Sequence, residues 1–396
     1  MGIFGKREEK ASRVGRLMSV ESLGRPMWTP RDYASLAKEG FAKNPIVYRA
    51  VRMISEAAAS APWLLYDAAH EVEGHPLLSL LTRPNPAQSG RALMETVYGH
   101  LMVAGNAYLE VVAIDEVPRE LHALRPDRMK VVPGADGWPA AFHYTAGART
   151  VEFVQDGQTP PILHMSLFHP LNDHYGFAPI EAAQTSLDIH NASGAWSKAL
   201  LDNAARPSGA LVYTGEGNLN DDQFERLKAE LEDGYTGARN AGRPLLLEGG
   251  LDWKTMAMSP RDMDFIEAKN QAAREIALAF GVPPMLLGIP GDSTYANYRE
   301  ANRAFWRQTV LPLVNKTAQS LGNWLAPAFE GDLRLSFDAD QIEALSTERE
   351  ALWDRVSAAD FLTREEKRAA VGYGVDEKPA EDEAGEEVGG GSTAVR

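Results

Sequence analysis

Two stretches in the first quarter of the chain have hydrophobic positions at helical spacing. The first predicted helix has an apolar face formed by Val47, Val51, Ile54 and Ala58. Asn44 is a suitable N-cap for it, Pro45 fits the first helical position, and Pro62 ends it. A second helix is predicted from about residue 90 to residue 103, with Gly105 positioned to end it.

The hydrophobic period then changes from that of helices to that of strands. Short runs rich in β-branched and aromatic residues follow one another, separated by Pro, Gly and Asp at turns. The predicted strands are "NAYLEVVAI", "LHALR", "MKVVP", "AAFHYTA", "RTVEFV" and "ILHMSLF". Together with the two helices, these strands predict an α+β domain over residues 41–170.

Long helices dominate the second half of the chain. One is predicted from residue 178 to about 203, opened by Pro179 and rich in the small residues that let helices approach closely. A second is predicted over 259–280 and a third over 294–325, with a bend expected at Pro312. A small α/β insertion separates the first two helices, with predicted strands "SGALVYT", "GRPLLLEGG" and "LDWKTM".

An apolar connection joins the second and third long helices. Its sequence, "AFGVPPMLLGIPGDS" at 279–293, contains three prolines and no charged residue before Asp292. Such a segment ordinarily marks a tight connection whose Met and Leu side chains are buried in a core. The alternative is a functional surface element. The arrangement of a small insertion between long helices favours that alternative, because a ring of several copies accommodates these pieces more readily than one globule does.

The end of the chain combines a strand, two helices and an acidic tail. The run "LRLSFDAD" predicts the strand, and "TREE" at 363–366 has the pattern of a capping box that opens the second helix. From residue 376 onward the sequence is acidic, contains three consecutive glycines and lacks aromatic residues. This composition predicts disorder.

Composition narrows the class of protein. Hydrophobic residues make up 44% of the 396 residues and charged residues 24%, so most of the chain should fold. The absence of cysteine excludes disulfides and thiolate metal sites. A formal net charge of −15 argues against binding nucleic acid through a broad basic surface, although not against brief contact. The longest apolar run, 276–290, is shorter than the roughly 20 residues that a membrane-spanning helix needs, so no membrane segment is predicted.

No sequence motif indicates a catalytic site. The patterns GxxxxGK[ST], GxSxG and HExxH are absent, and no GxGxxG follows a predicted strand. Asp338 and Asp340 favour a turn and helix cap over a metal pair. The best metal candidates lie in "HMSLFHPLNDH" and are His164, His169, Asp173 and His174. Their spacing suits neither one helix face nor a structural metal site, so polar strand-end and loop residues are the simpler interpretation.

Several short stretches occur together in one order. They are "NPIVYRAVRMISEAAASAPWLLY" (44–66), "RPNP" (83–86), "GNAY" (105–108), "ILH" (162–164), "YGFAPIEAA" (175–183), "NAARPSGAL" (203–211), "LLEGG" (246–250), "REIALAFGVPPMLLG" (274–288) and "TVLPLV" (309–314). Each is weak alone. As an ordered set they resemble the portal proteins of tailed bacteriophages, in the short branch found in long-tailed phages and phage-derived gene transfer agents.

The resemblance implies the portal fold, an α+β protein with a wing, long stem helices, a small α/β clip, a kinked tunnel helix and a short helical crown, assembled as a ring. The implied divisions are a flexible N-terminal arm (1–40), the wing (41–177 with 326–338), two stem helices (178–206 and 259–281), the clip (207–258), a tunnel loop (282–294), a tunnel helix (295–325), the crown (339–375) and a disordered acidic tail (376–396).

The resemblance also implies a function. Twelve copies would form a ring at one capsid vertex, serving as the channel for DNA packaging and ejection and as the docking platform for terminase and the head–tail adaptor. The implied partners are other copies of the chain, double-stranded DNA without sequence preference, terminase, the adaptor and the major capsid protein. Neither a membrane, a cofactor, a metal nor catalysis is implied. The implied location is the capsid vertex of a virion or virus-like particle, after assembly in the bacterial cytoplasm.

Two alternatives stay open. The histidines named above motivate a metal-dependent nuclease, and a head-completion adaptor would also form a ring. Adaptors, however, are usually much smaller chains and do not need paired stem helices and a crown.

The resemblance assigns two sets of residues to binding. The tunnel loop residues expected to line the DNA channel are Val282, Pro283, Pro284, Met285, Leu286, Leu287, Gly288, Ile289 and Pro290. The clip residues expected to dock terminase and adaptor are Asp221, Asp222, Glu225, Lys228, Glu232 and Arg239. An uncharged collar would touch DNA without holding it, because a basic lining would bind the phosphates, which carry about one charge per 1.7 Å of axis. Aspartate at position 286 or 287 is therefore expected to leave the ring assembled and to impair DNA passage.

Overall fold

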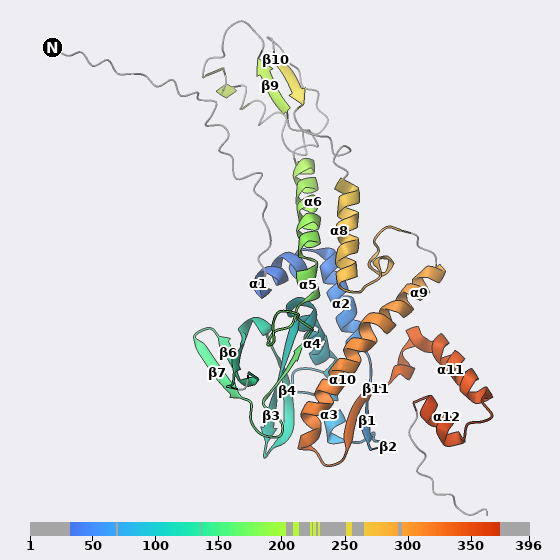
Figure 1. Cartoon of the computed structure of the whole chain (residues 1–396). Coiled ribbons are helices and arrows are strands. Elements are labelled where there is room, and N and C mark those ends of the chain that lie inside the picture. Colours follow the sequence, from blue (N-terminus) through green and yellow to red (C-terminus); the bar gives the residue numbers. More distant parts are fainter. Residues whose placement is uncertain are drawn as a thin grey trace, which may run out of the picture.

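The computed structural model of the chain has an elongated form (Figure 1). A broad base of strands and helices carries two long helices side by side, and a two-stranded ribbon lies beyond their far ends. The described residues are 32–202 without 69 and 136, 209–213, 222, 223, 225, 226, 229, 251–255, 265–291 and 295–372. The acidic tail from residue 376 lies outside them.

Two helices form the centre of the base. Helix α2 (Pro45–Ala59) begins at Asn44, whose side chain accepts hydrogen bonds from two backbone N–H groups of the first turn. Helix α4 (Gly90–Ala104) begins at Ser89 and ends at Gly105, which has a left-handed backbone with φ 68°. The predicted apolar stripe of α2 is buried and packs against α4. Burying a Val or Ile side chain stabilises a fold by roughly 1.5–3 kcal/mol, so this contact is a large contribution to the core.

The first helices of the chain correct one prediction. Helix α1 (Tyr33–Leu36) is capped by the Asp32 carboxylate, and a π-helix, η2 (Ala37–Ala42), continues it to the start of α2. Leu36 and Gly40 are buried. The proposed flexible arm of residues 1–40 is therefore wrong for its last residues, because Leu36 joins the core of the base.

The described strands form three three-stranded sheets and one ribbon, all antiparallel. The sheets are β11 (Leu333–Phe337), β1 (Trp63–Asp67) and β2 (His70–Glu71); β4 (Val117–Leu124), β3 (Asn106–Ile114) and β8 (Ile162–Ser166); and β5 (Met129–Pro133), β6 (Pro139–Ala146) and β7 (Arg149–Val154). The ribbon pairs β9 (Gly209–Tyr213) with β10 (Leu251–Thr255).

The strand predictions for the base are confirmed, with two omissions. The structure adds β1 with its short partner β2, and helix α3 (Pro76–Thr82). Strand β1 directly follows the proline that ends α2, and its five residues are too few to give a clear period of two. Its pairing with β11 joins parts of the chain that lie far apart in sequence, and α10 covers this sheet.

The long helices follow the predicted order. Helix α5 (Pro179–Ala182) leads into α6 (Gln184–Asp202), which packs against α8 (Phe265–Ala279). The helix predicted over 294–325 comprises α9 (Tyr295–Phe305), a π-helical segment η6 (Trp306–Val310) and α10 (Leu311–Leu325). The π-helical segment directly precedes Pro312. Because proline has no N–H for the carbonyl one turn earlier, the regular α-helical hydrogen bonding is interrupted near this point, and the bend expected there stays a prediction.

Short elements complete the described chain. They are the 3₁₀ turns η3 (Pro126–Arg128), η5 (Pro284–Leu287), η7 (Ala326–Ala328), η8 (Ala339–Gln341) and η9 (Glu343–Leu345), and the helices α11 (Ser346–Ala358) and α12 (Arg364–Ala370). The capping box of α12 is formed between Thr363 and Glu366, as predicted. Asp338 caps η8 by accepting from the Asp340 N–H, which confirms the turn-and-cap interpretation. None of the helices in the described residues is long and apolar enough to cross a membrane.

Candidate channel segment and stem

The connection between α8 and α9 is folded tightly against its neighbours; residues 281–291 are called the elbow below. Gly281 ends α8 with φ 67°, a conformation that favours glycine. The Thr309 hydroxyl donates a hydrogen bond of 2.6 Å to the Gly281 carbonyl. A Cβ on Gly281 would lie 2.7 Å from the same hydroxyl oxygen, so this close approach requires glycine. The elbow is thereby held against η6.

The far end of the elbow is tied back to the helix it came from. Residues Pro284–Leu287 form the 3₁₀ turn η5, and Gly288 reverses the chain with φ 72°. The Arg274 guanidinium on α8 then donates a hydrogen bond of 2.6 Å to the Pro290 carbonyl. Both ends of the elbow are therefore fixed to helices.

Three apolar side chains of the elbow are buried within the protein, which corrects the expected collar for these three residues. Val282, Leu286 and Ile289 are only 2%, 8% and 5% exposed. Leu286 belongs to the main core, and Ile289 packs with Ala273 and Ala277 of α8. Side chains buried within one copy cannot contact DNA. Aspartate at position 286 would place a carboxylate in the core, so we now expect it to lower the stability of the fold.

The exposed residues of the elbow are glycines and one proline. Gly281, Gly288, Pro290 and Gly291 are exposed, while Pro283, Pro284, Met285 and Leu287 are half-buried. That this segment lines a channel stays a prediction. If it does, a passing molecule meets chiefly glycine and proline, together with the partly exposed side chains of Met285 and Leu287.

The helix after the elbow carries a basic stripe that the sequence analysis did not identify. Arg299, Arg303 and Arg307 recur at a spacing of four, which puts them on one face across α9 and η6. Glu300 pairs with Arg303 at 3.5 Å. The spacing was readable from the sequence, but arginines on a surface helix are common. Their position directly after the elbow makes them notable.

The stem helices, α6 and α8, are locked to the base and to each other by polar contacts. The Ser186 hydroxyl on α6 donates to the Glu275 carboxylate on α8 at 2.5 Å. The Asn44 amide, beside its capping role, donates to Asn191 at 2.9 Å and to the His190 ring at 3.0 Å. Burial and the nearby charge of Lys269 lower the pKa of His190, so its ring accepts as a neutral group. The stem therefore leaves the base with a fixed direction.

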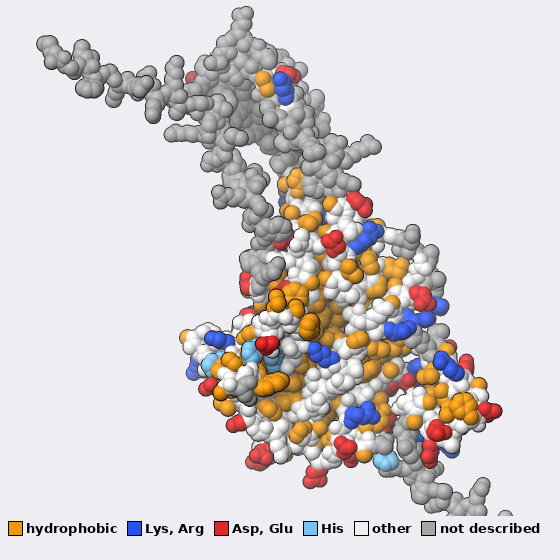
Figure 2. Space-filling model, viewed as in Figure 1, with side chains coloured by type: hydrophobic (Ala, Val, Ile, Leu, Met, Phe, Trp, Pro, Cys, Tyr) orange, Lys and Arg blue, Asp and Glu red, His pale blue; other side chains and the backbone are white. Residues whose placement is uncertain are grey.

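The stem also presents apolar side chains to solvent. Ile266 and Leu278 of α8 are each 79% exposed, and Ile189 of α6 is 42% exposed. Figure 2 shows hydrophobic side chains reaching the surface over the described part of the stem. These separate apolar side chains on a projecting element are available for contact with another molecule.

The predicted clip is described only in part. The strands expected in "SGALVYT" and "LDWKTM" are β9 and β10, paired with each other as the ribbon beyond the stem (Figure 1). Asp222 and Glu225 are exposed and helical. Asp221, Lys228, Glu232, Arg239 and the strand expected in "GRPLLLEGG" lie outside the described residues. The docking role of these residues stays a prediction.

The candidate metal ligands do not form a cluster. His164 donates from its Nε2 to the Asn106 side-chain oxygen at 2.9 Å and stacks on the Tyr108 ring at 4.4 Å. Burial lowers the pKa of His164 to about 4, so the ring is neutral near pH 7. The His169 ring instead accepts from the Leu171 backbone N–H. Among the described residues, no three side chains of His, Asp or Glu lie together as a metal would require.

Asn106 joins three of the sequence motifs. Its side-chain oxygen accepts hydrogen bonds from His164 of "ILH" at 2.9 Å and from the backbone N–H of Gly176 in "YGFAP" at 2.8 Å. The neighbouring Gly105 lies so close to Gly176 that a Cβ on it would be 2.6 Å from the Gly176 carbonyl oxygen. The motifs that appeared separately in the sequence therefore meet at one buried polar site that shapes the base.

A family of known proteins matches most of this chain. The family model described as "Phage portal protein" matches residues 45–372. An uncharacterized protein of Rickettsia bellii is 42% identical over 338 residues, which cover 84% of this chain and 88% of that protein.

Solved structures match as well. A chain in the neck of an empty GTA particle, computed with C6 symmetry, is 55% identical with a TM-score of 0.70. A chain in the neck of a native GTA particle, computed with C12 symmetry, is 54% identical with a TM-score of 0.68. Each match covers 88% of this chain and 96% of the other.

Proposed function

Because the chain belongs to the phage portal protein family, we propose that it forms the portal ring at one vertex of a virion or virus-like particle. Twelve copies encircle a channel through which DNA enters during packaging and leaves during ejection. The similarity to chains in particle necks computed with C6 and C12 symmetry supports a ring and its location.

One observation carries the proposal: the form and order of the projecting elements. Helices α6 and α8 leave the base together, the ribbon lies beyond them, and the elbow leads into a continuous helix from residue 295 to residue 325 (Figure 1). A single copy leaves Ile266 and Leu278 in water. In a closed ring each stem lies beside the stems of its neighbours, which removes these side chains from water.

The channel surface follows from the exposed residues near the elbow. The exposed glycines and Pro290 of the elbow offer DNA an uncharged surface. Beside it, Arg299 and Arg307 are exposed, and Arg303 between them is half-buried and paired with Glu300. Twelve copies at −15 carry a formal 12 × −15 = −180. This field repels DNA over about 8 Å at physiological salt, so the arginines act as weak local contacts within a repelling ring.

The remaining regions have separate roles. The ribbon and its insertion (207–258) dock the terminase during packaging and the head–tail adaptor afterwards. The base (41–177 with 326–338) contacts the capsid. The crown (339–375) faces the interior of the capsid. The protein acts as a conduit without catalysis of its own. The metal-dependent nuclease is not favoured, because the histidines that motivated it have other partners.

Electron microscopy of the purified full-length chain tests the ring. Negative-stain images are expected to contain rings with a central channel. The measured mass of the assembly is expected to be a multiple of the mass of one chain. A chain that is monomeric in every condition, including after extraction from particles, would contradict the proposal.

A second experiment separates a portal from a head-completion adaptor. Cells that lack the protein are expected to accumulate capsids without DNA, because packaging needs the portal. Filled heads that lack tails would instead support the adaptor, which acts after packaging.

A further inference from the structure

A groove lies on the base between the first helices of the chain and helices α2 and α4. Its volume is about 410 Å³, and its walls include Tyr33 and Phe41 from α1 and η2, Val51 and Ser55 from α2, and Thr96 and His100 from α4. The groove is far in sequence from the elbow and belongs to no part of the proposed channel.

Two polar atoms in the groove lack hydrogen-bond partners within the part of the chain that the structure describes. They are the Ser55 hydroxyl oxygen and the His100 Nδ1. Ser55 is only 4% exposed, and burial lowers the pKa of His100 to about 4, so that its ring is neutral near pH 7. Leaving a buried polar atom unpaired costs about 1–3 kcal/mol, so such atoms ordinarily have a partner. Both atoms would be satisfied by N–H or carbonyl groups of a peptide in the groove.

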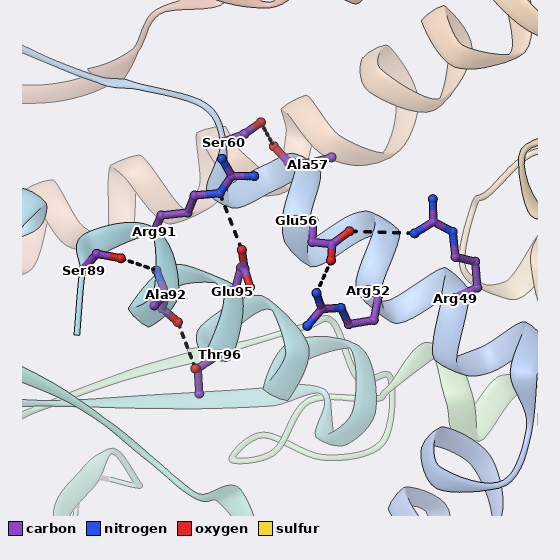
Figure 3. Close-up of polar contacts among 10 residues, drawn as sticks. All are labelled: Arg49, Arg52, Glu56, Ala57, Ser60, Ser89, Arg91, Ala92, Glu95 and Thr96. Atoms are coloured by element: carbon purple, nitrogen blue, oxygen red, sulfur yellow. Dashed lines mark hydrogen bonds and ion pairs between the residues drawn. The ribbon is translucent and has the colours of Figure 1, made fainter. Parts of the chain in front are cut away.

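The charged side chains beside the groove already pair with one another. Figure 3 shows Glu56 of α2 between Arg49 and Arg52, and Arg91 of α4 beside Glu95. The Arg49–Glu56 and Arg91–Glu95 distances are 3.8 and 3.5 Å. Since positive and negative groups alternate there, the groove has no strong preference for a charged ligand. Its apolar walls and two unpaired polar atoms suit an apolar segment with an accessible backbone.

We propose that residues 24–31 of the same chain occupy this groove. Their sequence is "GRPMWTPR", in which Met27 and Trp28 lie between two prolines. The segment ends next to Asp32, the cap of α1, and Tyr33 is already part of the groove wall. Prolines favour an extended backbone, which leaves N–H and carbonyl groups of the other residues accessible.

The length of the segment matches the groove. Helix α4 contributes lining residues from Ala92 to Val103, an axial distance of about 11 × 1.5 Å, or roughly 17 Å. Seven extended steps at about 3.3 Å span roughly 23 Å, so residues 24–31 reach from one end to the other. The same chain is favoured over a neighbour because a tether this short gives a high effective concentration.

Cross-linking tests the occupant, since the chain has no cysteine of its own. The full-length double variant Trp28→Cys with Thr96→Cys is treated with a short bifunctional maleimide. We expect an intrachain link, seen as a single chain that has lost both thiols and gained the mass of one cross-linker rather than two. The matched control joins Trp28→Cys to Val151→Cys, since Val151 is 50% exposed on β7 and outside the groove. The control should link at least tenfold less.

Two outcomes overturn the proposal. Links between chains, seen as dimers and larger species, would mean that the segment of a neighbouring copy enters the groove. Linking no greater than in the Val151 control would mean that the segment does not lie there. The experiment needs no DNA and measures a contact within one chain. A negative result would therefore leave the portal function intact, and a failure of the portal function would leave this contact intact.

A second variant fills the groove. A Cβ on Gly99 would meet only the Ser55 hydroxyl oxygen, at 3.8 Å, so Gly99→Phe directs a ring into the space without a backbone clash. Chymotrypsin is expected to cut after Trp28 at least fivefold faster in this variant than in wild type or in the surface control Val151→Phe. An unchanged rate in a variant with the wild-type unfolding midpoint would overturn the proposal. The cross-link decides it if Gly99→Phe fails to fold.

Discussion

The elbow and the connection at residues 167–178, called the wing loop below, share several residue types and differ in structure. Both contain proline, glycine and large apolar residues between regular elements. In the elbow, Leu286 is 8% exposed, whereas Phe168 and Leu171 of the wing loop are 82% and 89% exposed. The wing loop also contains His169, Asp173 and His174, which the elbow lacks, so the presence of large apolar residues does not by itself decide whether a connection faces inward.

The difference comes from where each connection is attached. The elbow is hydrogen-bonded to η6 at Gly281 and to α8 at Pro290. Because both ends are attached to helices, the residues between them pack against the protein. The wing loop is held at its ends, where the Leu167 N–H donates to the Gly105 carbonyl and Gly176 to Asn106. Its middle makes local turns instead, and these leave the apolar side chains projecting.

The largest expected effect compares one leucine from each connection. Leu286→Ala should lower the free energy of unfolding by about 2–4 kcal/mol, because it removes buried contacts and leaves a cavity. Leu171→Ala should change it by less than about 0.5 kcal/mol, because the side chain is already in water. Urea unfolding of both variants measures the difference. Equal effects would break the comparison.

The attachment of the wing loop is tested at Gly105. Alanine there combines an unfavourable positive φ with a Cβ 2.6 Å from the Gly176 carbonyl oxygen, so we expect a loss of roughly 2–3 kcal/mol in unfolding free energy. Gly147 has a similar φ of 62° and nothing within 4 Å of an added Cβ. Gly147→Ala should cost only about 1 kcal/mol. The difference in unfolding free energy between the two variants measures the effect of the close approach of Gly105 to Gly176. Equal losses in the two variants would show that this approach does not require glycine.

Acid should weaken the site beneath the wing loop. Burial, and less so the nearby His174, lowers the pKa of His164 to about 4 from its ordinary value of 6.5. The folded state thus binds this proton more weakly than the unfolded chain, so the stability that His164 contributes is complete above pH 6.5 and declines as pH falls towards 4.

The variant His164→Gln keeps an N–H donor for Asn106 and does not titrate. Its loss of unfolding free energy between pH 7 and pH 4.5 should be smaller than that of wild type by roughly 2 kcal/mol. Urea midpoints measured across this range give the slopes. The carboxylates of the chain titrate in both proteins, so the informative quantity is the difference between wild type and variant in how unfolding free energy changes with pH. An identical pH dependence in the two proteins would contradict the role proposed for His164.

The smallest effect on folding is expected at exposed apolar residues, where assembly is the informative measurement. Leu278→Asp on the stem should leave urea unfolding within about 0.5 kcal/mol of wild type and reduce the fraction of rings in negative stain. Ala268→Asp, at another exposed position of α8, controls for the added charge. The same change at Leu171 asks whether the exposed wing loop also contacts a neighbouring copy. Undiminished rings in Leu278→Asp would exclude a stem contact at this residue.

The sequence by itself determined most of the regular elements of this protein and indicated its family. Caps and breakers act within a few residues, so Asn44, Gly105, Pro312 and the Thr363 capping box were each readable locally. The order of long helices around an insertion, and the ordered set of motifs, indicated the portal family. Strand β1 was missed because its identity depends on pairing with β11, which lies far along the chain.

Only the tertiary structure decided which way the side chains of the candidate sites face. A run such as "VPPMLLGIP" is equally compatible with a collar and with a core, because hydrophobicity specifies removal from water but not the surface that provides it. The hydrogen bonds of Thr309 and Arg274 supply that direction for the elbow. The contact of Asn106 with His164 and Gly176 likewise depends on segments that meet only after folding.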